Sequence, residues 1–226
     1  MVNLNSANRT SFAAKTMEIF LYVFAALFSV INPLGTVPVF VGLTSDESIS
    51  ERNKTSLLTT INVVVILIIS FFAGTYLLAF FGISLNALRI AGGMIIVTSG
   101  FALLTGTFSK HKGMKNKRVQ KDLDKREKFS LTPLAIPMLA GPGSISLLIT
   151  FNQEYQQWNE MLYVVLAVLA VGLITFVILR SAHYISKFLG ASGINAISRI
   201  VGFIVISIGV EYIAAAVVSM LGALNT

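Results

Sequence analysis

Long apolar runs are the feature that most constrains the fold of this chain. A helix that crosses a bilayer needs roughly 20 consecutive apolar residues, and six runs approach or exceed this length. They lie at about 17–43, 56–81, 86–107, 130–151, 160–180 and 196–222. Only 12% of the residues are charged, which is too few to cover a soluble domain, where about 25% is usual. The sequence therefore predicts an all-α, polytopic membrane protein with six transmembrane helices.

The cysteine content and the net charge of the chain narrow the functions that it could have. The chain has no cysteine, and therefore neither disulfides nor thiolate metal ligands. The net charge of +7 would suggest a nucleic-acid partner in a soluble protein. Here the basic residues lie between the apolar runs, so we expect no nucleic acid, cofactor or resident metal. We expect residues 1–226 to form a single membrane domain whose main partner is the lipid bilayer.

The distribution of basic residues predicts the orientation. Nine of the chain's 17 lysines and arginines lie between the third and fourth runs. Loops rich in Lys and Arg stay on the cytoplasmic side of a membrane. We therefore expect loop 108–129 to be cytoplasmic and both termini to be periplasmic or extracellular, although Arg9 and Lys15 before the first run favour the opposite orientation.

The two halves of the chain resemble each other. The segment NALRIAGG from Asn86 aligns with NAISRIVG from Asn195, and NPLGTV from Asn32 aligns with AGPGSI from Ala140, at offsets of 108 to 110 residues. Three spans in each half would give the halves opposite topology, as in the inverted repeats of transporters. This predicts repeat 1 at about 17–107 and repeat 2 at about 130–222. The alternative is that apolar helices resemble one another by composition.

Two of the apolar runs contain helix-breaking residues at corresponding places. Proline in a helix interior costs about 3 kcal/mol or more, and lipid offers no water to the freed carbonyl. Asparagine is a good N-cap and proline suits the first helical position. Asn32-Pro33 therefore predicts that a half-helix begins at Leu34, and Gly141-Pro142 predicts a second one.

Paired half-helix N-termini would form a binding site. Each N-terminus carries a partial positive charge, which favours a small anion or a carboxylate. The alternative is a pair of ordinary kinks. The predicted substrate-binding residues are Asn32, Pro33, Gly35, Thr36, Gly141, Pro142, Gly143 and Ser144, with Ser146 and Thr150 as further hydroxyls.

The same segments carry a family resemblance. NPLGTVPVFVGLT, LRIAGGMIIVTSGFALLTG and PLAIPMLAGPGSISLLI resemble the signature regions of the MarC family of bacterial and archaeal inner-membrane proteins. The resemblance implies six spans, a distant similarity to the LysE and TerC exporter groups, and transport of small neutral amino acids such as glycine, alanine or threonine. The positions that match its motifs are Asn32, Pro33, Gly35, Pro38, Gly141, Pro142 and Gly143.

Charged residues within the apolar runs are further candidates. Glu211 lies near the middle of the sixth run, where a carboxylate is costly. We expect it to face the interior as a candidate for proton or sodium coupling, or else to lie near the interface or bond to a neighbouring hydroxyl. The family often has an amide here, which would confine such a role to this member. Arg89 and Arg199 are expected to anchor at the membrane surfaces, with a gate or carboxylate-binding role as the alternative.

The pattern as a whole favours a secondary transporter of small neutral amino acids or similar small polar metabolites. The alternatives are a metal-ion exporter, which would need several carboxylates or histidines at mid-membrane, and a membrane protein that transports nothing. An intramembrane serine protease using Ser144 would need a buried base, and both histidines, His111 and His183, lie outside the expected spans. We therefore expect no catalytic residues.

Overall fold

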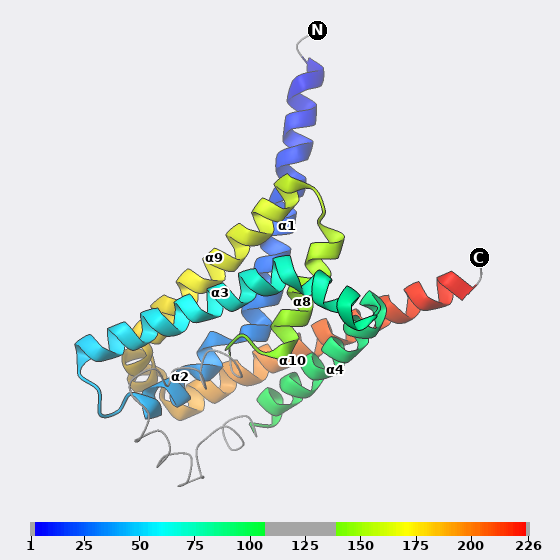
Figure 1. Cartoon of the computed structure of the whole chain (residues 1–226). Coiled ribbons are helices and arrows are strands. Elements are labelled where there is room, and N and C mark those ends of the chain that lie inside the picture. The colour runs from blue at the N-terminus through cyan, green and yellow to red at the C-terminus, as the bar shows by residue number, and fades with distance from the viewer. Residues whose placement is uncertain (1–2, 107–138, 225–226) are drawn as a thin grey trace.

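The computed structural model describes residues 3–106 and 139–224, and the secondary structure of these ranges is helical (Figure 1). The helices are α1 (Asn3–Ile31), α2 (Pro33–Leu43), α3 (Ile49–Phe81), α4 (Leu85–Thr105), α8 (Pro142–Glu154), α9 (Trp158–Arg180) and α10 (Ala182–Leu224). This confirms the predicted all-helical class. The basic loop 108–129 and the beginning of the fourth expected span lie outside the described residues.

Five segments are long and apolar enough to cross a membrane. They are Lys15–Leu43, Ile49–Phe81, Leu85–Thr105, Trp158–Arg180 and Ala182–Ala223. They correspond to the first, second, third, fifth and sixth apolar runs. The fourth run is represented by α8, whose 13 residues fall short of the roughly 20 that a spanning helix needs. Helix α8 therefore has the length of a half-helix.

The helices form a bundle that is apolar both inside and outside. In the interior, α1 packs against α9, α2 against α10, and α3 against both α8 and α9. Large side chains such as Leu27, Phe71 and Leu147 are buried there, whereas Phe80 and Phe188 are almost fully exposed on the outside. Exposed apolar surface of this kind is unfavourable in water and suits contact with lipid chains.

Helices α4 and α10 make the closest contact in the bundle and lie side by side in Figure 1. A Cβ atom placed on Gly202 would lie 2.8 Å from the carbonyl oxygen of Gly100, and one on Gly209 would lie 2.8 Å from that of Gly93. The two backbones therefore touch, as at membrane helix crossings built from small residues.

The glycine pairs also relate the two halves of the chain. Gly93 and Gly202 are 109 residues apart, as are Gly100 and Gly209, which is within the offset seen in the sequence. Their crosswise pairing is the arrangement that a two-fold axis between α4 and α10 would produce. The complete inverted repeat stays a prediction, because the start of the second repeat lies outside the described residues.

The link between the fifth and sixth apolar runs is helical for most of its length. Helix α10 begins at Ala182 and continues through the rest of the segment 181–195, which separates the two runs, to Leu224. Its helical conformation is interrupted at Gly190, where φ is 62° and ψ is 177°. Only glycine adopts this region at low cost, and no proline follows to prevent the helix from resuming. The chain therefore changes direction between the two runs at a kink at one glycine.

Candidate functional site

The first break lies at Asn32, as predicted. Its backbone is left-handed, with φ 44° and ψ 65°, and it is the one non-glycine residue in the described ranges with positive φ. Asparagine tolerates this region better than most residues. Its Oδ1 accepts a hydrogen bond from the backbone N–H of Gly35 at 3.2 Å. Asn32 thereby separates α1 from α2 and caps α2, whose first residue is Pro33.

The side-chain amide of Asn32 leaves its NH2 group, with two N–H donors, unpaired. The residue is only 4% exposed, and its Nδ2 has no hydrogen-bond partner. A Cβ atom on Gly35 would clash with this Nδ2, so Gly35 is what allows the amide to fold over the first turn of α2. A buried unpaired polar group costs about 1–3 kcal/mol. The amide is therefore available to a ligand that reaches the positive end of α2.

The second break differs from the first in its capping. Helix α8 begins at Pro142, and its N-cap Gly141 is extended, with φ −78° and ψ 172°. Because Gly141 has no side chain, the first turn of α8 has no side-chain cap. Its N-terminal positive end is therefore less satisfied than that of α2.

The two breaks lie near each other, although Asn32 and Gly143 are buried whereas Gly141 is half-buried and Pro142 is exposed. A Cβ atom on Gly143 would lie 2.9 Å from Cγ1 of Ile96 and 3.4 Å from Cγ1 of Val30. Val30 lies two residues before Asn32, so the start of α8 packs against the end of α1. Gly143 makes this approach possible because a side chain would meet Ile96 of α4.

The predicted hydroxyls are buried, but most of them are already bonded. Three of the four donate to backbone carbonyl oxygens, so their protons are not directed at a ligand. These bonds join Thr36 to Pro33 at 2.7 Å, Ser144 to Gly141 at 2.9 Å, and Ser146 to Leu88 at 3.3 Å. Thr150 is fully buried, and its Oγ1 lies near the Tyr212 hydroxyl without a hydrogen bond of ordinary geometry.

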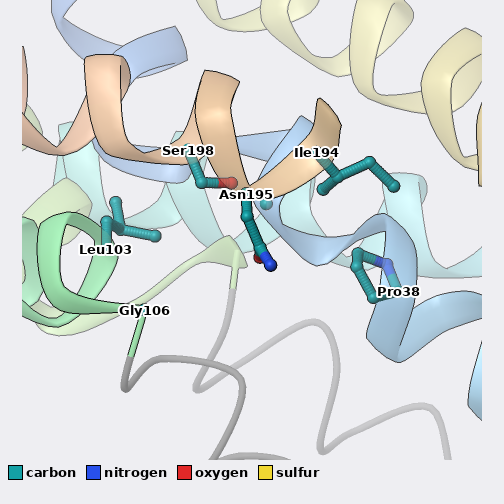
Figure 2. Close-up of a pocket in the computed structure, with 7 residues that line it drawn as sticks. Pro38, Leu103, Gly106, Ile194, Asn195 and Ser198 are labelled. Carbon is teal, nitrogen blue, oxygen red and sulfur yellow. The ribbon is translucent and has the colours of Figure 1, made fainter. Parts of the chain in front are cut away.

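A small cavity lies beside the first break. Figure 2 shows it between α2, the end of α4 and α10. Its lining residues are Gly35, Pro38, Leu103, Gly106, Ile194, Asn195 and Ser198. The volume is about 10 Å³, room for about one water molecule. Gly35 and Pro38 were singled out by the sequence. Asn195 and Ser198 were not, although the NA segment that repeats after Asn86 begins at Asn195.

The expectation that Glu211 faces the interior is wrong for this chain, because its side chain is exposed on α10. Neighbouring Gly209 and Tyr212 occupy the buried positions of this part of the helix, which turns Glu211 outward. Among the residues that the structure describes, no three histidine, cysteine, aspartate or glutamate side chains gather as metal ligands would.

Arg89 forms an ion pair rather than standing alone at a membrane surface. Its guanidinium donates to Oε1 of Glu154, joining the start of α4 to the end of α8. Glu154 lies beyond the fourth expected span, and burial raises the pKa of its carboxyl even though Arg89 opposes the shift. Burial, followed by the charge of Glu154, raises the pKa of the adjacent Tyr155 to about 12. A second pair joins Lys15 of α1 to Glu160 of α9 at 3.0 Å.

These features define a helical membrane protein with two neighbouring helix breaks. Residues 17–221 match the family described as "MarC family integral membrane protein". The chain belongs to the MarC family, as its motifs suggested.

Proteins with curated names resemble the chain over most of their length. The UPF0056 membrane protein BU267 of Buchnera aphidicola from Acyrthosiphon pisum is 36% identical over 88% of this chain and 91% of its own. The UPF0056 membrane protein YhcE of Escherichia coli K12 is 36% identical over 84% and 87%. The UPF0056 inner membrane protein MarC of Salmonella typhimurium is 34% identical over 83% and 88%. No solved structure matches the chain.

Proposed function

We propose that this chain is a secondary transporter of small neutral amino acids, or of similar small polar metabolites, in a bacterial inner membrane. The observation that carries the proposal is the proximity of two helix breaks, with the buried side-chain amide of Asn32 left unpaired at the first of them. Unpaired polar groups at membrane depth are costly, and interrupted helices of this kind hold substrates in known transporter folds.

The chemistry of the breaks matches both charged ends of an amino acid. The N-termini of α2 and α8 provide partial positive charge for the carboxylate, and Nδ2 of Asn32 offers a further donor. The C-terminal carbonyls of α1 end at the same break and provide partial negative charge for the ammonium group. A neutral side chain would then lie among apolar residues such as Val30 and Ile96.

The size of the cavity implies that binding requires movement. A volume of about 10 Å³ holds about one water molecule, which is smaller than glycine. We infer that the helices around the breaks separate to admit substrate and close again after its release, as alternating access requires. A proton or sodium gradient is the proposed driving force, with loop 108–129 on the cytoplasmic side.

An enzymatic function has less support. A serine nucleophile at Ser144 would need a general base to receive its proton. The Ser144 hydroxyl instead donates to the carbonyl of Gly141 at 2.9 Å, which cannot act as a base.

The proposal is tested by ligand-dependent thermal unfolding of the detergent-purified chain. Glycine, alanine and threonine are screened beside divalent metals and antibiotics. A bound amino acid at one hundred times its Kd would stabilise the folded state by about 2.7 kcal/mol. The Asn32→Gly variant serves as the control, since it keeps the left-handed backbone and removes the amide. Equal stabilisation of this variant, or stabilisation by metals alone, would overturn the proposal.

A further inference from the structure

The end of the bundle that carries turn 155–157 is closed by a charged contact between two elements. Arg89, in the first turns of α4, pairs with Glu154, the last residue of α8. Their side chains are 15% and 39% exposed, respectively, so the pair lies at the boundary between the interior and the surrounding medium. The ion pair therefore connects α8, which begins at the second helix break, to α4, which packs against α10.

Two buried hydroxyls lie directly behind the pair. Thr150 precedes Glu154 by one helical turn on α8 and is fully buried, and Tyr212 of α10 is buried next to it. The two hydroxyls are close enough to interact with each other, but neither makes a hydrogen bond of ordinary geometry. Buried polar groups are normally hydrogen-bonded to protein or water. An arrangement that admits water to this point would satisfy both hydroxyls, so the closed arrangement has a cost that the ion pair offsets.

The corresponding residues in the other half of the chain do not form an ion pair. The 108-residue offset that relates the two helix breaks places Asp46 opposite Glu154, and the alignment of Asn86 with Asn195 places Ser198, followed by Arg199, opposite Arg89. Among the residues that the structure describes, the ion pairs are Arg89–Glu154 and Lys15–Glu160. The two ends of the bundle therefore differ, with an ion pair between α8 and α4 at one end and none between the corresponding residues at the other.

We propose that the Arg89–Glu154 pair is a latch that keeps the 155–157 end of the bundle closed, and that its separation opens a hydrated path past Thr150 and Tyr212 toward the helix breaks. This proposal rests on the proposed transport function, in which the latch would be one of the two gates of the transport cycle. A partly exposed ion pair is well suited to this role, because it is strong enough to favour one state and weak enough to be broken during a cycle.

The absence of native cysteines permits a direct test by thiol accessibility. Thr150→Cys is the reporter, and a membrane-impermeant maleimide is applied to the chain in spheroplasts and in inverted vesicles, so that either orientation is covered. With the latch intact, labelling is slow. Adding Glu154→Gln, or separately Arg89→Gln, raises the labelling rate about fivefold, the effect expected of an ion pair at this exposure. Exchanging the charges, by Arg89→Glu with Glu154→Arg, restores slow labelling.

The Lys15–Glu160 pair provides a matched control. It joins α1 to α9 at 3.0 Å, at residues other than those of the latch. Glu160→Gln should leave labelling at Thr150→Cys unchanged, and size-exclusion profiles confirm that each variant is folded. The latch is disproved if neither Arg89 nor Glu154 substitution raises labelling, or if Glu160→Gln raises it equally.

The labelling readout needs no substrate, so the latch and the proposed function can fail separately. Increased labelling without any amino-acid stabilisation would retain the latch and reject the substrate class. Stabilisation by an amino acid without increased labelling would reject the latch and retain the substrate class.

Discussion

At the scale of single residues, Asn32 has two roles that a substitution can separate. Its backbone adopts a left-handed conformation at the break, and its side chain both caps α2 and leaves its NH2 group unpaired. Strained backbone of this kind is often found at functional sites. Asparagine fits both roles, since its short amide tolerates the conformation and reaches the first helical turn.

We expect Asn32→Ala to destabilise the chain by about 2 kcal/mol, because alanine is strained at positive φ and provides no cap. Asn32→Gly should destabilise the chain by less than about 1 kcal/mol. Glycine adopts the left-handed backbone without strain, so only the small penalty of glycine at an N-cap remains. Unfolding in mild detergent with a chemical denaturant measures both values. Equal destabilisation by the two variants would show that the left-handed backbone is not the source of the cost.

The raised pKa of Glu154 makes the latch sensitive to acid. Because burial favours the neutral carboxyl more than Arg89 favours the ionised one, protonation occurs above the ordinary pKa of 4.5. Labelling at Thr150→Cys, normalised at each pH to the denatured chain, should therefore begin to rise as the pH falls while it is still above 4.5. Glu154→Gln should give a flat profile, and a profile that rises only below pH 4.5 would contradict this account. The other titratable residues around the pair are Tyr22, Tyr155, Glu211 and Tyr212.

At the scale of helices, the starts of α2 and α8 could be predicted because local chemistry determines them. Asn-Pro and Gly-Pro define a cap and a first helical residue without reference to the rest of the fold. The kink at Gly190 and the outward position of Glu211 could not be predicted in this way. Both depend on how α10 packs against its neighbours, which a single apolar run does not record.

The α4–α10 contact gives a prediction at this scale. Gly202→Ala places a methyl group 2.8 Å from a backbone carbonyl oxygen and a backbone nitrogen of α4, and neither can move without shifting the helix. We expect a loss of stability of about 1–3 kcal/mol, typical of overpacking. Gly222→Ala is the control in the same helix, because a Cβ there meets nothing within 4 Å. Thermal unfolding of both variants measures the difference, and equal stability would exclude a tight backbone contact.

At the scale of the whole molecule, composition and run lengths were enough to predict a helical membrane protein. They did not predict the Arg89–Glu154 pair, because Arg89 and Glu154 are 65 residues apart in sequence and their proximity depends on how α4 and α8 are placed. The two helix breaks of the candidate site were predicted from the sequence. The donor left free on Asn32 and the cavity lined by Asn195 and Ser198 needed coordinates.

The most direct test is uptake of radiolabelled glycine, alanine and threonine by proteoliposomes that contain the purified chain, with a proton or sodium gradient imposed. The account predicts gradient-dependent uptake of at least one of these amino acids by the wild type, with a large loss in Asn32→Gly. Uptake that is undiminished in that variant, or no uptake above that of empty liposomes for all three under either gradient, would contradict it.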